Sequence, residues 1–218
     1  MTERTIAATT HGRCLVIPPA TAGPAPMLVG FHGYAEDAET QLERLRAIPE
    51  ASRWLIVSIQ GLHRFYQRRT DRVVASWMTR QDRELAIADN IAYVQSCIEA
   101  ISAEWPVKPA FVFAGFSQGV AAAFRAAANW ARGSTAVLAV GGDVPPDLDA
   151  SSLKRISASL IARGTADEWY TKEKFGEDER RLDDAGGAVR AVEFVGGHEW
   201  PAEINEAASN FLGEFVRR

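Results

Sequence analysis

The residue best placed to do chemistry in this chain is Ser117, at the centre of the pentapeptide GFSQG at residues 115–119. An apolar run over 109–114 precedes it, and an alanine-rich stretch over 120–128 follows it. A strand, a Gly-x-Ser-x-Gly turn and a helix describe a nucleophile elbow, whose sharp turn pushes the serine hydroxyl out at the end of the strand. Glycine lacks a Cβ and so permits this turn. We therefore expect a nucleophilic serine; a serine N-cap in an ordinary strand–turn–helix connection is the alternative.

The expected general base for this serine is His198. A serine hydroxyl is a weak nucleophile at neutral pH and needs a histidine that a carboxylate orients. In hydrolases built on such an elbow, the acid and then the histidine follow the serine in the chain. Of the four histidines, only His198 follows Ser117, in a glycine-flanked turn after the apolar run 189–195. The alternative is that His198 is an ordinary surface loop histidine. The position of His198 after the serine in the chain favours the catalytic interpretation.

The acid should lie in the loop after the preceding apolar run, 157–163. Asp167 is the best candidate because it comes three residues after Gly164, which ends that run. Glu168 is an adjacent competitor, and Asp143 occupies an equivalent loop after another apolar run. A buried aspartate at this place would fix the tautomer of the histidine and stabilise its imidazolium form.

Two backbone N–H groups are expected to bind the oxyanion of the tetrahedral intermediate. One belongs to Gln118, the residue after the nucleophile, and the other comes from an early strand-to-helix loop. A His32-Gly33 turn follows the apolar run 26–31, and it makes the N–H of Tyr34 the expected second donor. We interpret the His32 side chain as a brace for this loop.

The segment 60–82 leaves a strand at the same edge and could form part of a substrate pocket. Aromatic and methionine side chains suit an apolar acyl or alcohol group, although local packing of a long loop is an equal alternative. The side chains expected to bind substrate are Phe65, Tyr66, Trp77, Met78, Trp169 and Trp200. An anion could be attracted by Arg64, Arg68, Arg69 and Arg72, but a solvated loop face is the favoured interpretation.

Apolar runs alternate with helical patterns along the chain. This alternation predicts an α/β fold with a mainly parallel sheet of about seven strands and helices on both faces. Apolar residues at three- and four-residue spacings predict one helix over 83–104 and another that follows Pro201. The expected strands are 13–17, 26–31, 54–59, 109–114, 134–140, 157–163 and 189–195.

Length and composition favour one soluble domain over residues 1–218. A net charge of −4 and the lack of a long basic tract give no reason to expect a nucleic-acid partner, and we predict none. The N-terminus lacks the apolar region of a signal peptide, and no stretch is long enough for a membrane span, so we expect a cytoplasmic protein. Cys14 and Cys97 lack the spacing of a metal-binding pair, and we expect both to be small buried hydrophobes in a reducing compartment. The sequence does not indicate whether the protein forms oligomers.

With these residues in place, the chain resembles the carboxylesterase/phospholipase family of α/β-hydrolases, which includes bacterial carboxylesterases and acyl-protein thioesterases. The resemblance covers about residues 26–215 and implies an α/β-hydrolase fold without a large cap domain. It also implies a metal-free, cofactor-free enzyme that cleaves a small-molecule ester or thioester through an acyl-enzyme. Two departures, Tyr34-Ala35 in place of a second glycine and Trp169 in place of an aliphatic residue, put bulk beside the expected acyl site. The resemblance rests on His32-Gly33, the 115–119 elbow, Gly164 with Asp167, and Gly196-Gly197-His198.

The function that these residues favour is hydrolysis of carboxylic esters by Ser117, His198 and Asp167. A thioesterase, a lysophospholipase or an acyltransferase could use the same site. A ligand-binding protein on a hydrolase scaffold is the non-enzyme alternative, but such a protein would be expected to lack one of the three residues. A dienelactone-type hydrolase is less favoured, because such an enzyme would be expected to hold a cysteine in the elbow where this chain has Ser117.

Overall fold

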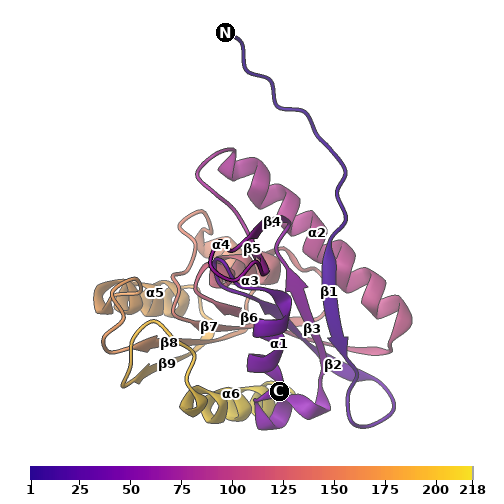
Figure 1. Cartoon of the computed structure of the whole chain (residues 1–218). Helices are drawn as coiled ribbons and strands as arrows, with labels where there is room; N and C mark the ends of the chain where they lie inside the picture. The colour runs from indigo at the N-terminus through magenta and orange to yellow at the C-terminus, as the bar shows by residue number, and fades with distance from the viewer. Residues whose placement is uncertain (218) are drawn as a thin grey trace.

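Seven strands form the main sheet in the computed structural model, which describes residues 1–217 (Figure 1). The strands are β1 (Arg13–Ile17), β2 (Ala25–Phe31), β3 (Leu55–Gln60), β6 (Val107–Phe116), β7 (Ser134–Val140), β8 (Ala158–Gly164) and β9 (Ala188–Phe194). Their spatial order is β1-β3-β2-β6-β7-β8-β9. β1 pairs antiparallel with β3, and the other neighbouring strands pair in parallel. The predicted α/β class and mainly parallel sheet are confirmed.

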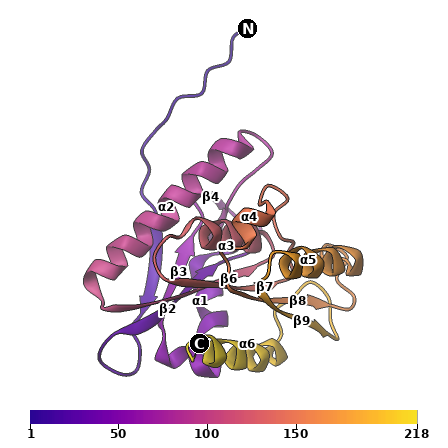
Figure 2. The same cartoon turned by 180° about the vertical axis from the view of Figure 1, so that it is seen from behind.

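Helices cover both faces of this sheet, as Figures 1 and 2 show from opposite sides. They are α1 (Ala38–Arg46), α2 (Arg83–Glu104), α3 (Gln118–Asn129), α4 (Ala150–Leu153), α5 (Lys172–Asp184) and α6 (Ala202–Phe215), with a short 3-10 helix, η1, at Pro49–Arg53. One apolar core joins α2, α3, α4 and α5 to one face, and a second joins α1, η1 and α6 to the other. Burial on both faces explains why β2, β3 and β8 are continuous apolar runs.

The predicted helix over 83–104 matches α2, and its apolar stripe faces the sheet. Val94, Ile98 and Ile101 of that stripe are buried, which is the packing expected of an amphipathic helix. Among residues 1–217, no helix combines the length and the apolar character that crossing a membrane requires.

The segment 60–82, expected to be irregular, contains an antiparallel hairpin. Its strands are β4 (His63–Tyr66) and β5 (Val73–Ser76). Ala35 N donates to Ala75 O, and Ala75 N donates to Glu36 O, so the hairpin is joined to the loop that follows β2. The sequence pattern misses this hairpin because each strand has only four residues and β4 is exposed along its length.

One edge of the sheet collects the residues that the sequence singles out. Parallel strands end at the same edge, and ligands bind there in open α/β sheets. The loops after β2, β6, β8 and β9 carry Tyr34, Ser117, Asp167 and His198, respectively. The topology therefore brings four distant segments of the chain to one place.

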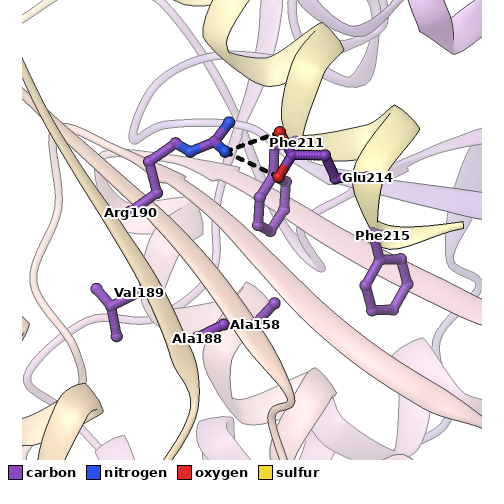
Figure 3. Close-up of a pocket in the computed structure, with 7 residues that line it drawn as sticks. All are labelled: Ala158, Ala188, Val189, Arg190, Phe211, Glu214 and Phe215. Carbon is purple, nitrogen blue, oxygen red and sulfur yellow. Dashed lines mark hydrogen bonds and ion pairs between the residues drawn. The ribbon is translucent and has the colours of Figure 1, made fainter. Parts of the chain in front are cut away.

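A small cavity of about 60 Å³ lies at the opposite edge, where β8 and β9 begin beneath α6 (Figure 3). Arg190, one of the residues that line it, pairs with both carboxylate oxygens of Glu214. The lining residues are Ala158, Ala188, Val189, Arg190, Phe211, Glu214 and Phe215. Because this cavity lies at the strand starts, we assign it no part in the chemistry of Ser117.

Candidate active site

Ser117 occupies a strained turn between β6 and α3. Its backbone has φ 50° and ψ −119°, a conformation that side-chain-bearing residues rarely adopt. The two flanking glycines permit close approach of the chain: a Cβ on Gly115 would lie 2.5 Å from Gly119 O, and a Cβ on Gly119 would lie 2.2 Å from Phe31 O. These contacts are those of a nucleophile elbow, in which the strand, the turn and the helix pack against one another.

We expect Gly119→Ala to destabilise the protein. The new methyl group would collide with the backbone oxygens of Phe31 and His32, at 2.2 and 2.6 Å. Overpacking of this kind lowers the free energy of unfolding by about 1–3 kcal/mol, which urea denaturation would measure. Gly176→Ala in α5 is the matched control, since its Cβ meets nothing within 4 Å. That change should stabilise the protein by about 0.5–1 kcal/mol, and equal effects of the two substitutions would contradict our description of the elbow.

His198 joins Ser117 to Asp167 through two hydrogen bonds. Its Nε2 lies 2.8 Å from Ser117 Oγ, and its Nδ1 lies 2.8 Å from Asp167 Oδ2. An ionised carboxylate only accepts hydrogen bonds, so in the neutral imidazole the proton is on Nδ1 and Nε2 accepts from the serine hydroxyl. This tautomer leaves Nε2 free to take the hydroxyl proton.

The Asp167 side chain is fully buried and held as a carboxylate. Burial alone would raise the pKa of Asp167, but hydrogen bonds from the backbone N–H of Tyr170, from His198 and from the backbone N–H of Trp169 outweigh it and lower that pKa. The two competing acids, Glu168 and Asp143, have exposed side chains. Of the three acids considered, Asp167 is the one that the structure places against His198.

A second buried carboxyl, that of Asp178 on α5, accepts a hydrogen bond from Tyr170 in the loop that carries Asp167. The Tyr170 hydroxyl donates to Asp178 Oδ2 at 3.1 Å, and Val144 N donates to the same oxygen at 2.8 Å. Tyr170 is itself buried, so its ring and its backbone N–H are fixed together. The sequence analysis missed Tyr170 and Asp178, because no local pattern pairs residues eight positions apart across a loop and a helix.

We expect Asp178 to make stability fall as the pH rises. Burial raises its pKa from 3.8 to about 6, so the folded state holds this proton more tightly than the unfolded state. That stabilisation is complete below pH 3.8 and is lost as the pH rises through 6. Relative to the wild type, the uncharged variant Asp178→Asn should therefore gain about 2 kcal/mol in the free energy of unfolding between pH 4 and pH 7. Urea denaturation at both pH values measures this difference, and a gap that does not change with pH would contradict it.

Tyr34 lies in a loop that buried His32 braces. The Nδ1 of His32 donates to Gly33 O at 2.7 Å, and the Nε2 of His32 accepts from Gly61 N at 3.0 Å. Burial lowers the pKa of His32, which keeps the ring neutral and preserves this pair of bonds. His32 therefore fixes the loop and takes no part in the hydrogen bonds of Ser117.

The Gln118 side chain fastens the start of α3 to the segment after the hairpin. Its Oε1 accepts from Trp77 N at 2.9 Å, and its Nε2 donates to Met78 O at 2.9 Å. As the first residue of α3, Gln118 also presents one of the backbone N–H groups that have no acceptor within the helix. This N–H lies next to Ser117 in the chain, at the positive end of the helix dipole.

An ion pair and an aromatic ring connect the Tyr34 loop to His198. Gly33 N donates to Glu36 at 2.7 Å, and Arg44 of α1 pairs with the same carboxylate at 2.6 Å. The Arg44 guanidinium lies over the Phe116 ring, 4.2 Å from its centroid, and that ring lies 5.2 Å from His198. The sequence analysis assigned no role to Glu36 or Arg44, although Glu36 stands three residues after the His-Gly turn.

Three of the side chains expected to bind substrate are exposed near this edge. Trp169 and Tyr66 are 76% and 71% exposed, and Phe65, at 36%, has its ring 5.8 Å from that of Tyr34. Tyr34 itself is 62% exposed. These four aromatic residues therefore present apolar surface to solvent.

The other three expected substrate residues lie in or against the protein core. Trp77 is fully buried, and its indole N–H donates to His32 O at 2.9 Å. Met78 is also buried and faces a space of about 10 Å³ between α2 and α3. Trp200 is half-buried and donates to Asn205 Oδ1. Trp77 thus braces the His32 loop through packing, which is the alternative that the sequence left open for this segment.

Among the residues that the structure describes, no three His, Cys, Asp or Glu side chains gather as metal ligands would.

Known structures share this arrangement of strands and helices. The esterase PE8 superposes with a TM-score of 0.73 at 19% identity, over 94% of this chain and 100% of that one. The Bacillus cereus carboxylesterase gives a TM-score of 0.70 at 15% identity, over 93% of this chain and 94% of that one. Zea mays acyl-protein thioesterase 2 gives a TM-score of 0.72 at 16% identity, over 94% of this chain and 100% of that one. No protein-family model and no curated protein matches the sequence. The chain has the α/β-hydrolase fold that the resemblance implies, shared with esterases and thioesterases.

Proposed function

We propose that this protein is a serine hydrolase that cleaves carboxylic esters through an acyl-enzyme intermediate. The observation that carries the proposal is the hydrogen-bonded series Asp167–His198–Ser117, with 2.8 Å at each of its two links. The strained backbone of Ser117 and the low pKa of Asp167 support it further. Nucleophile, base and orienting acid are the three roles that acyl transfer requires.

In the proposed reaction, Ser117 Oγ attacks the carbonyl carbon of the ester while His198 Nε2 takes the hydroxyl proton. The buried Asp167 carboxylate stabilises the imidazolium that forms. His198 then gives the proton to the leaving alcohol, and an acyl group remains on Ser117. Water, activated by the same imidazole, releases the acid and restores the serine.

The oxyanion of each tetrahedral intermediate would be bound by the backbone N–H groups of Tyr34 and Gln118. Both belong to segments whose positions are fixed by side-chain hydrogen bonds, through His32 in one case and the Gln118 amide in the other. Donors that are already oriented stabilise the developing charge without reorganisation during the reaction.

A thioesterase or lysophospholipase reaction at the same site is the second candidate, and the fold shared with an acyl-protein thioesterase favours keeping it. Matched oxygen esters and thioesters of one acyl group would separate the two activities. We propose short or accessible acyl groups, because Tyr34, Phe65 and Trp169 form an exposed rather than an enclosed apolar surface. A p-nitrophenyl ester series with a clear optimum at long chains would contradict this choice.

The direct test is labelling with a fluorophosphonate, which reacts rapidly only with an activated serine. We expect the label on Ser117, together with hydrolysis of p-nitrophenyl acetate or butyrate. The non-enzyme alternative, a ligand-binding protein on a hydrolase scaffold, predicts neither result.

A further inference from the structure

The two cysteines, distant in the sequence, meet between the edge strand and the longest helix. Cys14 lies in β1 opposite Ile59 of β3, and strand alternation places it on the face that α2 covers. Cys97 lies on α2, and both thiols are free. The expectation that they are buried hydrophobes is wrong, because both side chains are only partly buried. The reason is that β1 is the edge strand, so α2 covers it incompletely.

Tyr93 fixes the two elements at the level of the cysteines. Its hydroxyl accepts from Arg13 N at 2.8 Å and lies 3.1 Å from Gln60 O, to which it can donate. Tyr93 stands one helical turn before Cys97, and Arg13 directly precedes Cys14. The hydrogen bonds between Tyr93 and Arg13 therefore hold together the two segments that carry the thiols, and both cysteines line the same surface hollow.

Solvent reaches both thiols through an open surface hollow of about 430 Å³. Its walls include Gly12, Cys14, Leu62, Tyr93 and Cys97. A small oxidant can enter this hollow, which both cysteines line.

The two thiols differ in their acidity. The hydrogen bond from Cys97 outweighs burial and lowers the pKa of Cys14 to about 7, while the same bond and burial raise the pKa of Cys97. The thiolate is the reactive form of cysteine, so Cys14 is the better nucleophile of the pair. Cys97 keeps its proton and stays next to Cys14.

We propose that Cys14 and Cys97 form a peroxide-reactive dithiol site, in which Cys14 is oxidised first and Cys97 then closes a disulfide between β1 and α2. The Cys14 thiolate attacks one oxygen of hydrogen peroxide; the O–O bond breaks, and hydroxide leaves and takes up a proton. The Cys97 sulfur then attacks the sulfenic sulfur of Cys14 and the S–O bond breaks. The proton of Cys97 goes to the departing hydroxide, so the second oxygen leaves as water. Two thiols and one peroxide give one disulfide and two waters. This site does not involve Ser117.

The test treats the reduced, full-length protein with hydrogen peroxide and follows free thiols, intact mass and a non-reducing peptide map. We expect loss of both thiols, loss of two hydrogens in mass, a linked pair of Cys14 and Cys97 peptides, and a higher melting temperature than that of the reduced protein. A disulfide between two molecules, or oxidation of Cys14 to the sulfinic acid without a link, would overturn the proposal.

Two variants assign the order of the steps. Cys97→Ser should stop at a sulfenic acid on Cys14 that dimedone traps. Cys14→Ser should lose its remaining thiol about tenfold more slowly, because Cys97 stays protonated. Equal rates for the two variants would overturn the assigned order. Hydrolysis by the reduced variants should match that of the wild type, which keeps this test separate from the proposed function.

Discussion

Replacing Ser117 with alanine is expected to abolish ester hydrolysis while leaving the fold intact. The substitution removes the only atom that bonds covalently to the acyl group in the proposed reaction. Loss of the nucleophile in serine hydrolases lowers kcat by on the order of 10⁴–10⁶-fold. The Ser117 hydroxyl is hydrogen-bonded to His198 at the surface of the elbow, so its removal opens no cavity in the core. Steady-state hydrolysis of p-nitrophenyl butyrate measures the effect.

Ser96→Ala is a suitable control for this change. Ser96 is exposed on α2, where its hydroxyl donates to the backbone oxygen of Ala92. That variant should retain both hydrolysis and fluorophosphonate labelling, and the Ser117→Ala variant should lose both. Near-wild-type activity in folded Ser117→Ala would refute the assignment of the nucleophile.

The sequence predicted the positions of Ser117, Asp167 and His198 along the chain because each follows a strand buried on both faces. Such strands are continuous apolar runs, and parallel strands end at one edge of the sheet. Chain order then selected one histidine and one loop for the acid. Whether Asp167, Glu168 or Asp143 meets the histidine depended on loop geometry, which sequence spacing only ranks.

Burial of individual aromatic residues could not be predicted in this way. Trp77 and Trp169 are the same residue type beside the same site, yet the first is fully buried and the second is 76% exposed. Trp77 is buried because the unpredicted hairpin turns it under the His32 loop, where a backbone oxygen accepts its indole N–H. That Cys14 and Cys97 line one hollow was missed for a similar reason, since it depends on how α2 crosses the edge strand.

Asp167→Asn is expected to reduce kcat by on the order of 10⁴-fold, the loss that follows when a triad histidine is held in the wrong tautomer. In the wild-type protein, the carboxylate Oδ2 of Asp167 requires a proton on His198 Nδ1, which leaves Nε2 as the acceptor for the serine hydroxyl. An amide can donate to Nδ1 instead, and the proton then moves to Nε2, where it faces Ser117 and blocks proton transfer. The fold should survive, because the amide oxygen can still accept from Trp169 N and Tyr170 N.

Asp143→Asn and Glu168→Gln are the matched controls, since each removes one exposed carboxylate close to the same edge of the sheet. The hydrogen bonds of the His198 ring go to Asp167 and Ser117, and neither substitution changes them, so both variants should retain nearly full kcat. Comparison of the three variants on one p-nitrophenyl ester identifies the acid directly. If Asp143→Asn lost as much activity as Asp167→Asn, the acid would have to reach His198 in an arrangement other than the hydrogen-bonded one. If only Asp167→Asn is impaired, its buried carboxylate contributes about 5 kcal/mol of transition-state stabilisation, at 1.36 kcal/mol for each factor of ten.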